Sequence, residues 1–217
     1  MELGACVESG ESAKTAARAK IAAPAKKSFR TFFARETDGL LPWYDRCMGS
    51  SLTYTRKTIS PESTKQLAAT LAQYLHEGDT IVLSGDLGAG KTQFVQGLAY
   101  ALGIRDAIVS PTFNILLAYP GTPGGLPLYH FDLYRLDEPD QLEDIGFYET
   151  IDGDGISVIE WGEKFLDAMP YSYLEIVISC SQDENNSRKI TVRSIGDRAR
   201  QLLHVWATDS KSRLMKA

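Results

Sequence analysis

The strongest chemical signature in this 217-residue chain is a glycine-rich segment that ends in a lysine and a threonine. The segment fits the pattern GxxxxGK[ST] in full and consists of Gly85, Asp86, Leu87, Gly88, Ala89, Gly90, Lys91 and Thr92. Glycines at this spacing let the backbone curl so that successive N–H groups point at phosphate oxygens, and a following helix adds its positive N-terminal end. The lysine supplies charge near the β- and γ-phosphates, and the threonine hydroxyl supplies a ligand to Mg²⁺. The segment therefore predicts binding of a nucleoside triphosphate with Mg²⁺.

Two acidic residues each end an apolar run, which is where a nucleotide-hydrolysing site needs an acid. Asp132 follows the run 128–131, and Glu160 follows the run 156–159. An acid at the end of a neighbouring strand holds the water shell of the metal or orients the attacking water. Each residue by itself is also compatible with a surface carboxylate that caps a loop. His130, within the first run, is interpreted as a structural histidine whose hydrogen bonds are satisfied.

A short segment with two hydroxyls, Ser110-Pro111-Thr112-Phe113, lies between the glycine-rich segment and the two acids. The hydroxyls of Ser110 and Thr112 are within the reach expected for a γ-phosphate or a metal ion, and Pro111 limits the conformations that the segment samples. We interpret the segment as a candidate switch. The alternative is a plain turn between two strands.

The elements that must position these groups alternate between helices and buried strands. Ser60 is expected to cap a helix that begins at Pro61 and closes at Gly78, and an apolar strand without alternation is expected over 80–84. Further strands are expected over 115–119, 126–131, 156–160, 174–179 and 189–193, and further helices over 91–102, 138–145 and 197–206. The turn-forming residues 120–125 predict a hairpin between the first two of these further strands. Together these elements predict an α/β sandwich with a largely parallel sheet.

Composition excludes several classes of protein. The chain is 43% hydrophobic and 24% charged, which is typical of a globular protein. Its three cysteines do not fit a disulfide framework, and no CxxC or Cys/His cluster indicates a zinc site. Because no apolar run reaches about 18 residues and the N-terminus lacks the apolar core of a signal peptide, we expect a cytoplasmic protein without a membrane partner.

Charge is distributed unevenly along the chain. Residues 1–57 carry ten Lys and Arg against six Asp and Glu, whereas residues 58–217 carry 13 against 22, a net charge of −9. We predict that 1–57 is a disordered extension and that 58–217 is a P-loop ATPase domain. The extension has three possible origins: a functional basic tail, an organelle transit peptide, or a natural start at Met48. An acidic domain without a basic face is not expected to bind RNA by itself, so a partner is expected to hold any RNA.

Four blocks of sequence, taken in order, resemble the TsaE family of bacterial ATPases that act in the synthesis of tRNA threonylcarbamoyladenosine. These blocks are the residues 85–92, 110–113, 129–136 (YHFDLYRL) and 159–161 (IEW). The resemblance covers about residues 58–195. It implies a P-loop NTPase-like three-layer α/β sandwich with a mostly parallel central sheet, which binds ATP and Mg²⁺. It also implies an accessory role, in which ATP hydrolysis supports turnover of a complex of TsaD-like and TsaB-like proteins. That complex places threonylcarbamoyl on adenosine 37 of tRNAs reading ANN codons. The chain is then expected to reach tRNA only through these partners.

The same resemblance implies roles for individual residues. Lys91 matches the phosphate-binding lysine and Asp132 the acid linked to hydrolysis, while Thr92 and Glu160 match the magnesium site. Trp161 matches a tryptophan beside the nucleotide, although a core aromatic is the alternative for this residue. The family's further nucleotide contacts align loosely with Glu62 and Arg188.

Two features depart from the family or leave another class open. The apolar stretch 114–119 replaces a more polar one, and the N-terminal extension has no counterpart in the family. The alternative function is a P-loop small-molecule kinase, because kinases share the same phosphate loop. Kinases also carry several lid arginines, whereas only Arg105 and Arg135 lie between Lys91 and Arg188.

Overall fold

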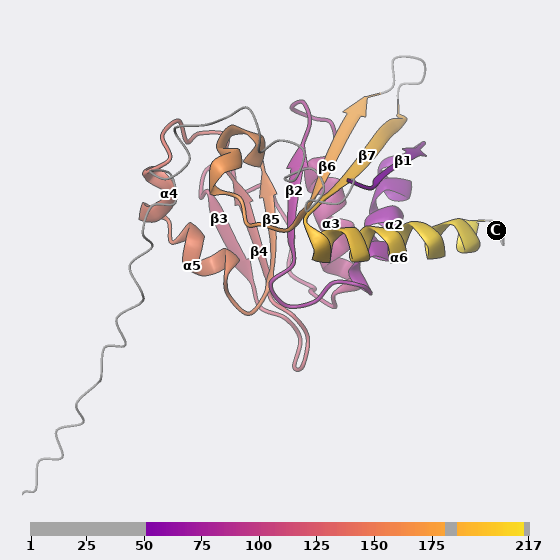
Figure 1. The fold of residues 1–217 in the computed structure, drawn as a ribbon, viewed down its shortest axis with the longest axis horizontal. Helices are drawn as coiled ribbons and strands as arrows, with labels where there is room; N and C mark the ends of the chain where they lie inside the picture. Colours follow the sequence, from indigo (N-terminus) through magenta and orange to yellow (C-terminus); the bar gives the residue numbers. More distant parts are fainter. Residues whose placement is uncertain (1–50, 181–185, 215–217) are drawn as a thin grey trace, which may run out of the picture. The chain divides into compact units, whose positions relative to one another are not determined.

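The computed structural model describes residues 51–180 and 186–214, which form a mixed α/β unit around one sheet (Figure 1). Its elements, in chain order, are β1 (Thr53–Thr58), α2 (Pro61–Ala72), β2 (Thr80–Ser84), α3 (Lys91–Ala101), β3 (Leu116–Tyr119), β4 (Leu128–Asp132), α4 (Gln141–Asp144), α5 (Phe147–Ile151), β5 (Ile156–Glu160), the 3₁₀ helix η2 (Gly162–Ala168), β6 (Tyr173–Cys180), β7 (Arg188–Ile195) and α6 (Asp197–Leu214).

The seven strands are arranged in the order β1-β7-β6-β2-β5-β4-β3. The four inner strands β6, β2, β5 and β4 run parallel to one another. β7 and β3 are added antiparallel at the two sides, and β1 pairs antiparallel with β7. All five residues of β2 and all five of β5 are buried, as expected for strands that are covered on both faces. The predicted α/β class with a mostly parallel central sheet is confirmed, and so is the hairpin of β3 and β4.

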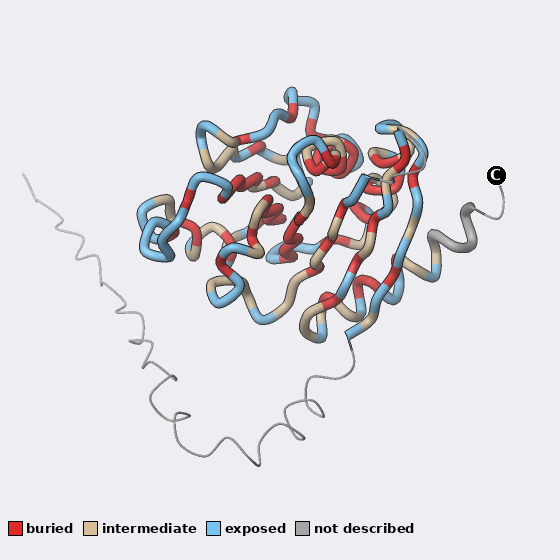
Figure 2. The backbone as a smooth tube through the Cα atoms, turned by 90° about the horizontal axis from the view of Figure 1, so that it is seen from above, coloured by how far each residue is buried: buried red, intermediate tan, exposed pale blue. Residues whose placement is uncertain are grey.

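Helices cover both faces of the sheet and bury two separate apolar clusters. The larger cluster packs α2, α3 and α6 against one face and includes the fully buried Phe94 and Trp206. The second cluster packs α4, α5 and η2 against the other face and includes Phe131 and Phe147, whose ring centroids lie 5.2 Å apart. Figure 2 shows the buried residues gathered in the interior of this unit, with exposed residues at its periphery. The fold is therefore a three-layer sandwich.

The start of α2 follows its local sequence closely. Ser60 caps the helix: its Oγ accepts a hydrogen bond from the backbone N of Ser63 at 3.1 Å, and Ser63 Oγ accepts from the backbone N of Ser60 at 3.0 Å. Pro61 occupies the first helical position, where its missing N–H costs nothing. The predicted start is confirmed, but the helix ends at Ala72 rather than continuing to Gly78.

Three further predicted boundaries are wrong. Thr53–Thr58 forms β1 and pairs with β7, so the ordered domain begins before the predicted boundary at residue 58; the rest of the predicted extension, 1–50, lies outside the described residues. The helix predicted over 138–145 is shorter, since α4 covers only Gln141–Asp144. A second helix, α5, was not predicted; it follows Gly146, whose left-handed φ of 65° separates it from α4. The last helix continues to Leu214 instead of ending at residue 206.

No helix within residues 51–180 and 186–214 is both long and apolar enough to span a membrane.

Candidate nucleotide-binding site

The glycine-rich loop joins the carboxyl end of β2 to the first turn of α3. Gly85 has a φ of 140°, and a Cβ at this position would lie 2.2 Å from the carbonyl oxygen of Ile178, so no other residue fits there without a backbone shift. Gly90 caps α3 with a left-handed φ of 110°. The loop thus places exposed backbone at the positive end of α3, which is the geometry that binds phosphate.

The side chain of Lys91 is folded back into this loop. Its Nζ donates hydrogen bonds to the carbonyl oxygens of Gly85 at 2.8 Å and Asp86 at 3.3 Å, and only 5% of the residue is exposed. Nζ also lies 4.4 Å from the ring centroid of Trp161, within cation–π range. Trp161 has a φ of 63°, an uncommon conformation for a bulky residue, and is half-buried. Backbone strain of this kind tends to occur at functional sites.

The two acids lie directly opposite each other on neighbouring parallel strands. Asp132 ends β4, Glu160 ends β5, and the two are partners in the strand register. Their residues are only 2% and 3% exposed. The alternative of a surface carboxylate is therefore wrong for both residues, since each is held inside the structure next to the phosphate loop.

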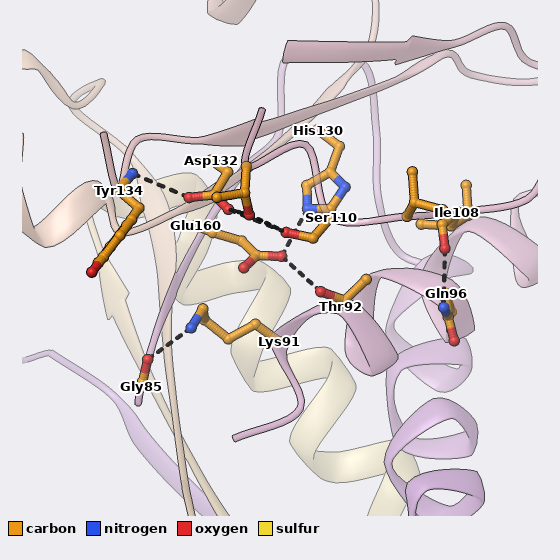
Figure 3. Close-up of polar contacts among 12 residues, drawn as sticks. Gly85, Lys91, Thr92, Gln96, Ile108, Ser110, His130, Asp132, Tyr134 and Glu160 are labelled. Atoms are coloured by element: carbon orange, nitrogen blue, oxygen red, sulfur yellow. Dashed lines mark hydrogen bonds and ion pairs between the residues drawn. The ribbon is translucent and has the colours of Figure 1, made fainter. Parts of the chain in front are cut away.

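Glu160 connects the phosphate loop to β4. Its Oε1 accepts a hydrogen bond from Thr92 Oγ1 at 3.3 Å and lies 2.9 Å from Nε2 of His130, as Figure 3 shows. His130 is fully buried, but its Nδ1 has no hydrogen-bond partner among the described residues. The interpretation of His130 as a satisfied structural residue is thus wrong, because one ring nitrogen contacts a site acid and the other is unpaired.

Asp132 holds the segment that was interpreted as a switch. Its Oδ2 accepts hydrogen bonds from Thr112 Oγ1 at 2.6 Å and Ser110 Oγ at 3.2 Å, while Oδ1 accepts from the backbone N of Tyr134 at 3.1 Å. Both hydroxyls of the segment therefore point at this acid rather than away from the site. Figure 3 shows the side chains of Asp132 and Glu160 near each other beside Lys91 and Thr92 at the start of α3.

These groups surround one open cavity of about 490 Å³, a volume within the usual range for small-molecule sites. The lining residues come from the phosphate loop, α3, the 110–112 segment and the ends of β4 and β5: Leu87, Gly88, Gly90, Lys91, Thr92, Gln93, Ser110, Thr112, Asp132, Tyr134, Glu160 and Trp161. Gln93 and Tyr134 also line the cavity, although the sequence alone does not assign them to the site. Only their position in the sequence could have indicated this, since each lies within two residues of a predicted site residue.

The other predicted residues, Gly85, Asp86, Ala89, Arg188 and Glu62, do not line the cavity. Arg188, at the start of β7, donates from Nε to the carbonyl oxygen of Ala89 at 2.8 Å and so braces the phosphate loop from outside. Glu62 is exposed in the first turn of α2, and no contact within the described part of the chain joins it to the cavity. Its assignment remains a prediction.

The oxygen atoms at the cavity fit a magnesium ion that is shared with phosphates. Thr92 and Glu160 present a hydroxyl and a carboxylate at one point, and oxygen is the ligand atom that Mg²⁺ prefers. Within the described residues, no group of three or more His, Cys, Asp or Glu would hold a metal unaided. This sparse donor set suits Mg²⁺, which in nucleotide sites takes one or two protein ligands and completes its shell with water and phosphate.

Comparisons with known proteins agree with one another. The sequence model described as "Threonylcarbamoyl adenosine biosynthesis protein TsaE" matches residues 58–190. The tRNA threonylcarbamoyladenosine biosynthesis protein TsaE of Bacillus subtilis is 41% identical over 146 residues, which cover 67% of this chain and 89% of that protein. The TsaE protein of Treponema pallidum is 43% identical over 133 residues, covering 61% of this chain and 95% of that protein. The crystal structure of Bacillus subtilis YdiB superposes with a TM-score of 0.63 at 33% identity, covering 75% of this chain and 99% of that one.

Proposed function

We propose that this chain, which belongs to the TsaE family of threonylcarbamoyl adenosine biosynthesis proteins, binds ATP with Mg²⁺ in the cavity at the start of α3 and hydrolyses it. The observation that supports the proposal best is that the predicted groups come together at one cavity. Three residues of the phosphate loop, its lysine, its threonine and two buried acids from neighbouring strands all line the same cavity.

The residues of the loop account for binding. Backbone N–H groups of the loop and the first turn of α3 face the phosphates, and Lys91 exchanges its two carbonyl partners for oxygens of the β- and γ-phosphates. Thr92 and Glu160 would hold Mg²⁺, which neutralises charge on the phosphates when bound. Because Lys91 already lies beside the loop, nucleotide binding exchanges the hydrogen-bond partners of its ammonium group.

The second acid accounts for hydrolysis. The carboxylate of Asp132 lies at the cavity wall and only accepts hydrogen bonds when ionised, so it is suited to orient a water molecule toward the γ-phosphorus. Attack by the water oxygen breaks the bond between the γ-phosphorus and the bridging oxygen, and the products are ADP and phosphate. Because Thr112 and Ser110 donate to the same carboxylate, their segment responds to whatever Asp132 binds.

The cavity favours hydrolysis over the alternative of a small-molecule kinase. No arginine is among the lining residues of the cavity. Arg105 donates to the carbonyl oxygen of Tyr100, and the guanidinium of Arg135 stacks on the exposed ring of Phe113 at 4.3 Å. The described residues therefore lack the cluster of arginines with which a kinase lid clamps a transferring phosphoryl group.

The relatives are named for threonylcarbamoyladenosine biosynthesis on tRNA, so we assign the ATPase an accessory role in that modification. In this role, ATP hydrolysis supports turnover of a TsaD-like transferase that works with a TsaB-like protein. The tRNA is held by these partners, in keeping with the acidic character of residues 58–217.

The test is reconstitution of threonylcarbamoyl transfer to tRNA with the two partner proteins, with and without this chain. We expect transfer to continue beyond one turnover only with the unmodified chain and ATP. Lys91→Ala should lower phosphate release by about 100- to 1,000-fold, because the lysine stabilises charge in the transition state. Lys65→Ala, a lysine of α2 outside the cavity, is the matched control. Unaltered ATP hydrolysis in a folded Lys91→Ala protein would refute the site, and transfer that is independent of this chain would refute the role.

A further inference from the structure

His130 lies at the centre of the polar contacts around Glu160 and has no role in the function proposed above. On β4, His130 shares the face of Leu128 and Asp132, and the histidine is fully buried. Its Nε2 lies 2.9 Å from Oε1 of Glu160, on the neighbouring strand. The histidine thus contacts an acid of the site without lining the cavity.

The contact defines which atom donates. An ionised carboxylate only accepts hydrogen bonds, so Nε2 of His130 carries the proton and donates it to Glu160. Nδ1 is then left buried, with no partner among the described residues. A buried, unpaired polar atom is unfavourable compared with an apolar side chain of the same size, so packing alone does not explain a histidine here.

The hydrogen bond also gives the two carboxylate oxygens of Glu160 different surroundings. Oε1 of Glu160 accepts from both His130 and Thr92, which fixes the carboxylate between β4 and the start of α3. Oε2 has no hydrogen-bond partner within the described part of the chain, and the residue lines the cavity. The histidine therefore leaves one oxygen of Glu160 available at the site and prevents rotation of the carboxylate.

We propose that His130 is a positioning residue, which orients the Glu160 carboxylate for Mg²⁺ bound with the nucleotide. This inference rests on the proposed function and adds a residue that acts through Glu160. Residues that orient a metal ligand in this way typically change metal affinity by about 10- to 100-fold when they are replaced.

The experiment measures how strongly Mg²⁺ couples to nucleotide binding in the full chain. Calorimetry gives the affinity for the non-hydrolysable β,γ-imido analogue of ATP, once with Mg²⁺ and once with a chelator. His130→Leu roughly keeps the volume of the side chain but removes the donor. In His130→Gln, the side-chain amide retains an N–H that can reach Glu160. Phe131→Leu, which alters the next residue on the opposite face of β4, controls for loss of packing.

We expect His130→Leu to reduce the gain in affinity from Mg²⁺ by about 10-fold or more while affinity in chelator stays unchanged. His130→Gln should restore most of the gain in affinity from Mg²⁺. Phe131→Leu should lower the melting temperature but leave the gain in affinity from Mg²⁺ unchanged. The Mg²⁺ concentration for half-maximal phosphate release should rise in His130→Leu by the same factor. Should that variant not fold, His130→Met removes the same donor.

Two results would be adverse, and they differ. A normal Mg²⁺ gain in a folded His130→Leu or His130→Met protein, or an equal loss in Phe131→Leu, overturns the positioning role and leaves the proposed function standing. No binding of the analogue to the unmodified chain overturns the proposed function, and the positioning role with it.

Discussion

The two acids of the site have different partners, so their removal should have different effects. Glu160 contacts Thr92 and His130, whereas Asp132 contacts the hydroxyls of the 110–112 segment. We expect Glu160→Ala to weaken binding of MgATP as well as turnover. Asp132→Ala should lower the rate by about 100- to 10,000-fold, the range for loss of a side chain that assists the attacking water, with nucleotide still bound.

Calorimetric affinity and the rate of phosphate release, measured on both variants, separate these effects. Because Asp132→Ala also frees Ser110 and Thr112, Asp132→Asn is the companion variant, since its amide oxygen still accepts from those hydroxyls while the charge is gone. Matching profiles of affinity and rate in the Glu160 and Asp132 variants would show that the roles are divided wrongly.

Trp161 should report directly on binding at the phosphate loop. The ammonium of Lys91 lies 4.4 Å from its ring centroid, so transfer of that charge to a phosphate changes the surroundings of the indole. We expect MgATP to change the tryptophan emission of the full chain and Trp161→Phe to abolish the change. Trp206→Phe is the control, because Trp206 is a buried residue of α6 whose Nε1 donates to Thr70 of α2, away from the cavity. An unchanged response in Trp161→Phe would place the reporting group elsewhere.

At the residue scale, the sequence predicts the residues of the glycine-rich loop better than the contacts that hold the two acids in place. Lys91 and Thr92 belong to an eight-residue pattern whose spacing is set by the geometry of phosphate binding, so the local sequence predicts their surroundings. The contact of His130 with Glu160 depends on the register between β4 and β5, which no local pattern encodes. The histidine therefore looks like an ordinary core residue until the strands are paired.

At the scale of elements, β1 is the strand on which the domain boundary depends. It pairs with β7 along its whole length, and its Tyr54 is buried with the ring centroid 5.6 Å from that of Trp206. We predict that a chain beginning at Thr58 is less stable than the full chain by about 3 kcal/mol or more, the cost of removing one buried aromatic side chain. This loss corresponds to a fall in melting temperature of roughly 6 to 12 °C.

A chain that begins at Met48 is the control, because it keeps β1 but lacks most of the extension. Its melting temperature, followed by circular dichroism, should equal that of the full chain. If the chain from Thr58 melted at the same temperature as the chain from Met48, β1 would contribute nothing and the boundary originally predicted at residue 58 would be restored.

The elements that the sequence predicts well are those whose burial leaves a pattern. β2 and β5 are buried on both faces and read as unbroken apolar runs. In contrast, β1 reads TYTRKT and lies at the edge of the sheet, where only Tyr54 and Thr58 are buried, so its apolar signal is nearly absent. Gly146 divides α4 from α5 through its left-handed φ, a choice that glycine permits but does not require.

At the scale of the molecule, charge restricts what the domain binds unaided. Residues 48–217 carry 15 Lys and Arg against 22 Asp and Glu, a net charge of −7. Some of the cations are already engaged inside the domain: Arg198 is paired with Asp79, and Arg193 with Glu175. Affinity for nucleic acid comes mainly from cations that neutralise phosphates, so the domain has little means to hold tRNA.

We therefore predict that the chain beginning at Met48 does not bind tRNA by itself but joins the TsaD-like and TsaB-like pair in a nucleotide-dependent manner. The dependence is expected because Thr112 and Ser110 donate hydrogen bonds to Asp132 at the cavity, and segments of this kind are ordered by γ-phosphate and Mg²⁺ contacts.

Binding to labelled tRNA is measured over a series of salt concentrations, and binding to the partner pair is measured with ATP, ADP and no nucleotide. Tight, strongly salt-dependent binding of tRNA without partners would contradict the argument from charge, and equal binding to the pair in all three nucleotide states would contradict the switch. If the full chain bound tRNA where the shorter chain did not, residues 1–47 would be an RNA-binding arm, because eight of the chain's Lys and Arg lie there against six acidic residues.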